Sequence, residues 1–219
     1  MRNEIINLRD YKRIAIMGGT FDPIHYGHLV TAEAVRSMYD VERVIFIPTG
    51  SPPHKSTPPD VSHSEHRYLM TVLATYNNPF FDISRIEIDR PGITYTIDTI
   101  AQIREICNDQ IKIYFITGAD AVSEIINWKD SEQLLKMCSF IAVTRPGYNK
   151  DKLRGQVNSI KLDYQSRLHY LEVPELDISS SDIRERVRTG KPIKYMLPLE
   201  VEDYIAKNAL YKGDRPLEL

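Results

Sequence analysis

One short segment, Gly18–His28 (GGTFDPIHYGH), has the residue types and spacing of an anion-binding turn. His25 and His28 are three positions apart, so on a helix both imidazoles would face the same side. Each ring can donate an N–H to a phosphate oxygen. Gly18 and Gly19 would let backbone approach a ligand closely, because no Cβ stands in the way. The segment therefore predicts a site for a polyphosphate.

A second candidate segment lies late in the chain, at Ile178–Arg184 (ISSSDIR). A serine such as Ser180 can cap a helix that starts near Asp182, which leaves the N–H groups of the first turn for phosphate. Arg184 supplies a planar fork that matches phosphate oxygens. The two segments together predict one phosphate pocket built from both ends of the chain.

Simpler interpretations exist for each segment taken alone. The glycines can form a plain tight turn with surface histidines, and the serines can cap an ordinary helix with a solvated arginine. The spacing of His25 and His28 also occurs in zinc sites, but no third ligand stands at a suitable distance. It is the combination of the two segments that favours the phosphate pocket.

The elements that position these segments follow an alternating pattern. Short apolar runs rich in β-branched residues alternate with amphipathic stretches, which predicts an α/β fold with a Rossmann-like, doubly wound parallel sheet. The runs are Arg13–Met17, Arg43–Pro48, Phe81–Ile88, Ile111–Thr117, Phe140–Thr144 and His169–Val173. The stretches are Gly27–Tyr39, Ser64–Tyr76, Thr94–Cys107, Ala119–Ile126 and Ser131–Met137.

This arrangement places the first segment where open α/β sheets bind ligands. Gly18–His28 directly follows the first run, at the carboxyl end of a predicted strand. The next helix is expected to begin near Gly27, so its free N–H groups and positive dipole end would face the same crevice.

Two parts of the chain depart from the alternation. Residues 48–59 (PTGSPPHKSTPP) are rich in proline and predict an extended surface loop. From about 175 to 211 the pattern is helical, with helices expected at Ser180–Thr189 and Leu199–Lys207. We expect residues 1–219 to form a single domain with a small helical C-terminal part.

Composition narrows the class of protein. The chain has 219 residues, 42% hydrophobic and 26% charged, with a net charge of −2, so it lacks the basic excess typical of nucleic-acid binders. No run approaches the roughly 18 apolar residues of a membrane span. The two cysteines, Cys107 and Cys138, match no metal or redox spacing. We expect a soluble cytoplasmic protein with no nucleic-acid or membrane partner, and a homo-oligomer is plausible from symmetry preferences.

The two segments carry a resemblance to a known superfamily. Gly18–His28 resembles the GxFxPxHxGH signature of the nucleotidyltransferases, and Ile178–Arg184 is similar to their ISSTxIR segment, with Ser181 in place of the commoner threonine. The resemblance implies a Rossmann-like fold and transfer of a nucleotidyl group from ATP or CTP. It implies phosphate contacts from His25, His28 and Arg184. The ATP-binding residues that it implies are Gly18, Gly19, Thr20, Phe21, Gly118, Asp120, Ser179 and Ser180.

Further segments resemble the bacterial nicotinate mononucleotide adenylyltransferases. They are Pro52–Lys55 (PPHK), Gly92–Thr96 (GITYT), Ile116–Asp120 (ITGAD) and the tryptophan-containing stretch Asn127–Lys129 (NWK). The resemblance implies that Lys55 reaches substrate phosphate and that Trp128 stacks on the pyridine ring. It implies that Tyr95 and Thr96 hold the ring carboxylate, and Arg145 is a weaker candidate for substrate contact. Locally, Asp120 fits a ribose contact or a helix cap, and Trp128 fits a core residue.

The resemblance predicts the partners and the cofactor. ATP and nicotinate mononucleotide would be the substrates, and Mg²⁺ would accompany ATP on phosphate oxygens and water, with no protein metal ligands. Nicotinamide mononucleotide and phosphopantetheine remain alternative acceptors, and a cytidylyltransferase is a further rival. A nucleotide sensor without activity and a zinc module are alternatives of other classes, disfavoured by the intact motifs and by the missing ligands.

Overall fold

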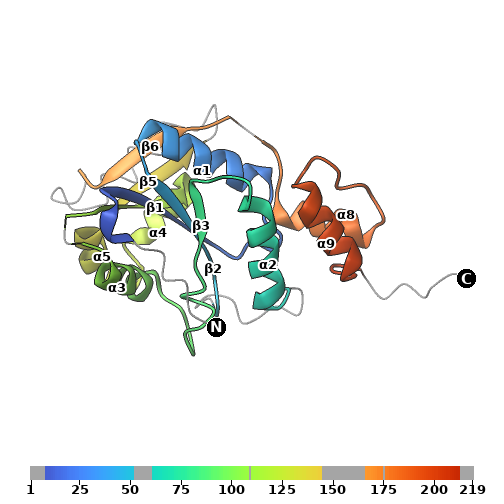
Figure 1. The fold of residues 1–219 in the computed structure, drawn as a ribbon, viewed down its shortest axis with the longest axis horizontal. Helices are drawn as coiled ribbons and strands as arrows, with labels where there is room; N and C mark the ends of the chain where they lie inside the picture. Colours follow the sequence, from blue (N-terminus) through green and yellow to red (C-terminus); the bar gives the residue numbers. More distant parts are fainter. Residues whose placement is uncertain (1–7, 52–60, 109, 145–165, 175, 213–219) are drawn as a thin grey trace, which may run out of the picture.

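A six-stranded parallel sheet forms the centre of the molecule (Figure 1). The computed structural model describes residues 8–51, 61–108, 110–144, 166–174 and 176–212. The strands are β1 (Arg13–Gly19), β2 (Arg43–Pro48), β3 (Phe81–Ile83), β4 (Lys112–Gly118), β5 (Ser139–Thr144) and β6 (Leu168–Glu172).

The strand order identifies where a ligand should bind. The sheet runs β3-β2-β1-β4-β5-β6, and every neighbouring pair is parallel. The chain thus winds one way from β1 to β3 and the other way from β4 to β6. Ligands of open α/β sheets bind at such a reversal, which here lies between the carboxyl ends of β1 and β4. The predicted Rossmann-like, doubly wound α/β fold is confirmed.

Helices cover both faces of the sheet (Figure 1). One face carries α1 (Tyr26–Met38) and α2 (Ser64–Thr75). The other carries α3 (Thr96–Ile106), α4 (Val122–Ile125) and α5 (Ser131–Met137). Short 3-10 turns occur at η1 (Leu8–Asp10) and η2 (Ala119–Ala121).

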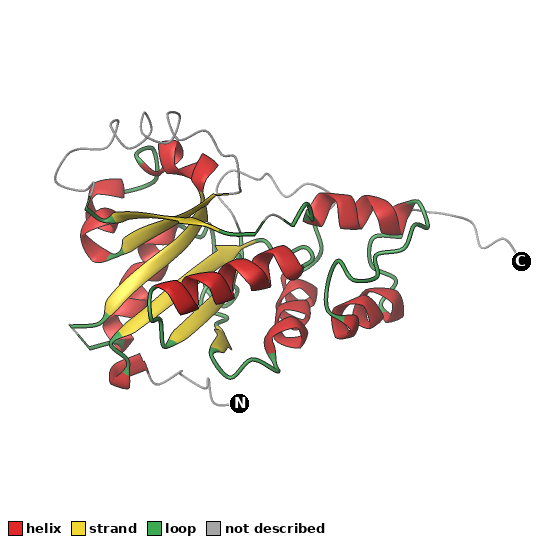
Figure 2. Cartoon of the chain, turned by 90° about the horizontal axis from the view of Figure 1, so that it is seen from above, coloured by secondary structure: helices red, strands yellow, loops and turns green. Residues whose placement is uncertain are grey.

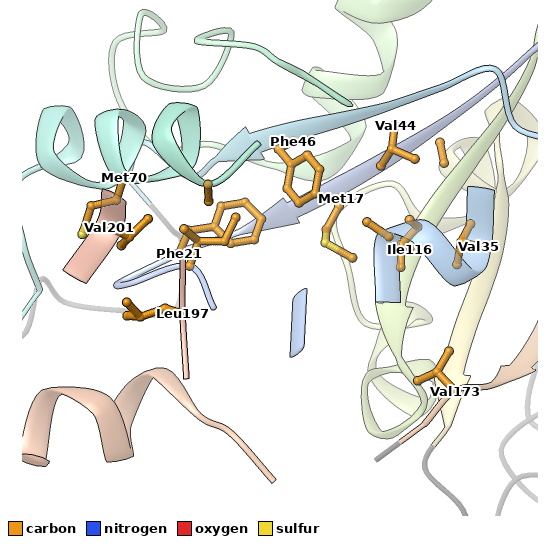
Figure 3. Close-up of a cluster of buried hydrophobic side chains, with 14 of the residues drawn as sticks. Met17, Phe21, Val35, Val44, Phe46, Met70, Ile116, Val173, Leu197 and Val201 are labelled. Atoms are coloured by element: carbon orange, nitrogen blue, oxygen red, sulfur yellow. The ribbon is translucent and has the colours of Figure 1, made fainter. Parts of the chain in front are cut away.

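The alternation of side chains along β1 explains the two-sided core. Ile14 and Ile16 point into the cluster shared with α3, α4 and α5, whereas Ala15 and Met17 point into the cluster shared with α1 and α2. Successive strand residues face opposite sides of a sheet, so a strand buried on both sides must be apolar throughout. Figure 3 shows part of the second cluster around Phe21 and its neighbours.

The two C-terminal helices lie beyond one end of the sheet (Figure 2). They are α8 (Ser180–Arg188) and α9 (Leu199–Lys207), and α9 packs against α2. Ile183, Val201 and Ile205 are fully buried in the cluster that contains Met17. The helical C-terminal part therefore shares a core with the sheet.

One predicted strand is shorter than expected. β3 ends at Ile83, not at residue 88. Its last ladder bond runs from the N–H of Ser84 to the carbonyl of Phe46, 2.9 Å away, and the chain then turns, with Asp89 N–H bonding back to Arg85. β3 is an edge strand with a partner on one side only, so an apolar sequence alone does not extend its pairing.

In the part of the chain that is described, no helix is long and apolar enough to cross a bilayer.

Candidate active site

A cavity of about 980 Å³ opens at the carboxyl ends of β1 and β4. Its wall brings together residues from the first segment, from α3, from the turn after α4 and from the start of α8. The predicted site residues that line it are Gly18, Gly19, Thr20, His25, His28, Tyr95, Thr96, Gly118, Trp128, Ser179 and Ser180. The two segments from opposite ends of the chain thus meet in one cavity, as the sequence predicts.

The two histidines are held in a defined arrangement at the start of α1. His25 is the N-cap residue, and His28 lies in the first turn. Their ring centroids are 3.9 Å apart. The backbone N–H of His25 donates to Nδ1 of His28 at 3.3 Å, so neutral His28 carries its proton on Nε2. His28 can therefore donate from Nε2 to a ligand in the cavity.

Burial keeps both imidazoles neutral. It lowers the pKa of His25 to about 4, and burial together with the neighbouring His25 lowers the pKa of His28 to about 3. A charged imidazole would lose its hydration here, and two such charges would repel each other. At neutral pH the pair therefore offers N–H donors without net charge.

The glycines and Phe21 fit tightly around these rings. A Cβ on Gly27 would lie 3.0 Å from atoms of the His25 ring, and one on Gly19 would lie 2.9 Å from the Phe21 ring. Phe21 is only 2% exposed and contacts His28 edge-on, with ring centroids 5.1 Å apart. Phe21 is not among the described residues that line the cavity. Its ring therefore supports the histidines from behind.

The late segment is tied directly to the first one. Ser179, not Ser180 as predicted, caps α8 by accepting the N–H of Asp182 at 3.1 Å. The hydroxyl of Ser180 instead donates to the carbonyl of Pro23 at 2.9 Å. Since α8 begins at Ser180, as the Ser180–Thr189 pattern predicts, the cap is the residue before it.

Arg184 also contacts the first segment. Its Nη1 donates to the carbonyl of Asp22 at 2.7 Å, and Nη2 donates to the hydroxyl of Ser181 at 3.3 Å. Of the side chains that are described, Arg184 does not line the cavity. It connects α8 to the turn before the histidines.

Asp22 is a structural residue that the sequence interpretation missed. It is 2% exposed, and its carboxylate accepts the hydroxyl of Tyr211 at 2.6 Å and the N–H of Ser62 at 3.1 Å. Burial and the adjacent Asp22 raise the pKa of Tyr211. The Gly18–His28 turn is thus fastened to the end of the C-terminal part, a link that no local pattern reveals.

Arg67 is a second residue that was missed. This α2 side chain is only 3% exposed, and its guanidinium donates to the carbonyls of Thr20 at 2.8 Å, Thr49 at 2.7 Å and Ser62 at 3.0 Å. Thr20 and Thr49 follow β1 and β2, and both line the cavity. Arginine stays protonated in proteins, so Arg67 adds a fixed positive charge behind these two loops. The sequence signal that could have identified Arg67 is the presence of an arginine on the apolar face of a predicted helix.

The far side of the cavity is apolar and aromatic. Trp128 packs edge-on against Phe115 and Phe140, each with ring centroids 6.1 Å away, and also lines the cavity. Trp128 is thus partly buried against the core and also faces the cavity, and its stacking on a pyridine ring stays a prediction. Tyr95 is the N-cap residue of α3, so the first turn of that helix, with its free N–H groups, also lies at this cavity.

Glu87 is a further cavity residue that the sequence interpretation missed. It is 9% exposed and accepts the hydroxyl of Thr99 at 2.8 Å. Its backbone carbonyl would lie 2.2 Å from a Cβ on Gly50, so only glycine fits there. Burial raises the pKa of the Glu87 carboxyl. Glu87 thus joins the loop after β2 to α3.

Some predicted site residues are not tested by the structure. Lys55 and Arg145 lie outside the described residues, and so does the side chain of Asp120. Within the described part, no group of three histidine, cysteine, aspartate or glutamate side chains could hold a metal ion.

Comparison with known proteins places this cavity in a family. Residues 16–186 match the cytidylyltransferase-like family. A probable nicotinate-nucleotide adenylyltransferase of a Thermoanaerobacter species is 57% identical over 202 residues, which cover 92% of this chain and 95% of that protein. A relative of the same description from Moorella thermoacetica is 54% identical over 200 residues, covering 91% of this chain and 92% of that protein.

A solved structure supports the fold. Plasmodium falciparum nicotinic acid mononucleotide adenylyltransferase, complexed with NaAD, superposes with a TM-score of 0.71 at 22% identity, covering 92% of this chain and 98% of that chain. The family itself is shown by the family match and by the sequence relatives. The chain belongs to the cytidylyltransferase-like family and, within it, to the nicotinate-nucleotide adenylyltransferases.

Proposed function

We propose that the cavity joins the adenylyl group of ATP to nicotinate mononucleotide, giving nicotinate adenine dinucleotide and pyrophosphate in NAD biosynthesis. The observation that carries this proposal is the meeting of His25 and His28 with Ser179 and Ser180 in one cavity. The names of relatives that match most of the chain support it.

The ATP half of the site would lie over the carboxyl end of β1. Gly18, Gly19 and Thr20 would receive the nucleotide backbone, and His25 and His28 would donate N–H groups to its phosphates. Since both rings are neutral, much of the attraction for the triphosphate would come from helix N-termini and fixed cations. Gly118 and Asp120 would lie toward the nucleoside.

Arg184 and Lys55 would complete the phosphate contacts. Arg184 bonds to the Asp22 carbonyl through Nη1, and its remaining N–H groups would reach a phosphate after rotation of the side chain. Lys55 would approach from the proline-rich loop.

The mononucleotide half would lie between Trp128 and α3. Trp128 would stack on the pyridine ring. The N–H groups at Tyr95 and Thr96 would hold the ring carboxylate, which only accepts hydrogen bonds, whereas a carboxamide would oppose its own N–H donors to them. Each such mismatch costs about 1–3 kcal/mol, which favours the acid over the amide. Arg145 is a further candidate contact.

The chemistry would be an in-line displacement. An oxygen of the mononucleotide 5′-phosphate attacks the α-phosphorus of ATP, the new P–O bond forms, and the bond to pyrophosphate breaks. A phosphate monoester has a second pKa of about 6, so the nucleophile is already ionised at neutral pH. The protein would then act by positioning and by donating to the leaving pyrophosphate, with no covalent intermediate.

Mg²⁺ would enter the site as part of the ATP substrate. The described residues do not form a set of metal ligands, so phosphate oxygens and water would supply the coordination. The unpaired cysteines Cys107 and Cys138 fit a cytoplasmic location, which we also propose.

Incubation of the pure protein with ATP and Mg²⁺ tests the proposal. Nicotinate mononucleotide, nicotinamide mononucleotide and phosphopantetheine would be compared as acceptors, with CTP as an alternative donor, and pyrophosphate release would be followed. We expect the highest kcat/KM with ATP and nicotinate mononucleotide. A higher value with phosphopantetheine or CTP would refute the proposal.

A further inference from the structure

An ion pair lies at the end of the cavity where we place the pyridine ring, and it has no role in the proposed mechanism. Lys129 follows Trp128 in the chain and lines the cavity. Its Nζ lies 3.4 Å and 3.3 Å from the two carboxylate oxygens of Asp98, a residue in the first turn of α3. The same Nζ is 4.5 Å from the centroid of the Tyr95 ring. The pair therefore connects the two elements assigned to the pyridine ring.

We propose that Lys129 is a specificity-determining residue that favours a mononucleotide with an anionic ring substituent. Asp98 holds the Lys129 ammonium at this wall of the cavity. Its negative charge also weakens the attraction of that ammonium for an anionic substituent. The inference rests on the proposed function, since it requires the pyridine ring between Trp128 and α3. A carboxylate gains Coulomb energy from a nearby cation, whereas a neutral carboxamide gains little.

The ion pair can serve substrate selection because it contributes little to the stability of the fold. The Lys129 and Asp98 side chains are 45% and 40% exposed, and exposed ion pairs contribute little to stability. Lysine carries three N–H donors on a flexible stem, so Nζ can contact Asp98 and a ligand together. Asp98 itself occupies the positive end of α3, where it repels a second carboxylate.

The charge of the pair gives a ranked test. Asp98→Asn leaves a net +1, the wild type and the double variant are neutral, and Lys129→Gln leaves −1. The ratio of kcat/KM for nicotinate over nicotinamide mononucleotide should be highest in Asp98→Asn and lowest in Lys129→Gln. Each step should change this ratio by about 1.5- to 5-fold, the range of a partly exposed charge interaction.

Controls separate a charge effect from a structural one. Lys136→Gln removes an exposed lysine of α5 and should leave the ratio unchanged. The KM for ATP should stay the same in all variants. The differences should shrink at high salt, because exposed charges are screened. Calorimetric titration with each mononucleotide gives the same ranking without turnover.

The outcomes distinguish this inference from the proposed function. An unchanged ratio in both single variants, or a shift in the same direction in both, would overturn the role of Lys129 while the enzyme remains an adenylyltransferase. A wild-type protein that uses neither mononucleotide would overturn both.

Discussion

At the residue scale, the site depends on the proton positions of two imidazoles, the buried His25 and the half-buried His28. His28 accepts the His25 N–H through Nδ1, which directs its Nε2–H outward as a donor. The donor is neutral and fixed before substrate arrives, so it needs no reorganisation as charge gathers on pyrophosphate.

His28→Ala should lower kcat by about 10²–10³-fold, as loss of one charge-stabilising donor typically does. His28→Asn keeps an acceptor and a donor and should recover part of the loss. Steady-state kinetics with ATP and nicotinate mononucleotide give the values, and thermal unfolding checks that both variants fold. An unchanged kcat in His28→Ala would exclude His28 from catalysis.

The same burial makes the fold sensitive to acid. The folded-state pKa values of about 4 for His25 and about 3 for His28 lie below the unfolded value of 6.5. The unfolded chain thus binds more protons as the pH falls from 6.5 toward these values, and stability is lost in that window. From pH 7 to pH 5 the loss should be about 2 kcal/mol per histidine.

Urea unfolding at the two pH values measures this loss. His28→Ala should lose about half as much as the wild type over this range, because one of the two groups is gone. Equal losses in both proteins would mean that the pKa of His28 is the same in the folded and the unfolded chain.

At the element scale, α2 controls the loops after β1 and β2 through Arg67. Arg67→Lys keeps the charge but loses the planar fork, so at least one buried carbonyl loses its donor at a cost of about 1–3 kcal/mol. Arg67 bonds to the carbonyls of Thr20 and Thr49, which lie at the carboxyl ends of the central strands, where we place ATP. The KM for ATP should therefore rise more than the KM for the mononucleotide.

Denaturant unfolding and the two KM values check this prediction. Arg85→Lys is the matched control, because Arg85 pairs at the surface with Glu65 and Asp89. A control that changes stability and KM as much as Arg67→Lys would count against a specific role for Arg67.

At the scale of the whole molecule, the C-terminal part fastens the active-site turn. Tyr211→Phe removes the hydroxyl from the buried Asp22 carboxylate and should cost about 1–3 kcal/mol of the free energy of unfolding. Since α8 and α9 share a core with the sheet, we propose that the chain unfolds as one domain, in one transition.

Tyr195→Phe provides the comparison, because Tyr195 is 82% exposed. Urea unfolding should show a single transition for each protein and a loss of stability only in Tyr211→Phe. Two separate transitions would contradict the single-domain proposal, and equal stabilities would contradict the role of Tyr211.

Local patterns were enough to predict most elements and both site segments. The alternation of apolar runs with amphipathic stretches predicted the doubly wound sheet, because strand and helix periods are written in neighbouring residues. The end of β3 and the cap of α8 were predicted wrongly. Both features depend on a neighbour in space. β3 extends only as far as it pairs with β2, and Ser180 donates its hydroxyl to the β1–α1 turn and leaves the cap to Ser179.

Periodicity was therefore sufficient for the fold class, and the resemblance carried by the two short motifs was sufficient for the reaction family, since both are written in neighbouring residues. The phosphate-binding roles of the individual residues stay predictions. Three features needed the folded structure: the neutral imidazoles, the contacts of Arg67 and Tyr211 with the turn, and the ion pair of Lys129 with Asp98 beside the cavity. Burial sets the first, and the others join residues far apart in the chain. Desolvation and long-range contacts exist only once the chain is folded.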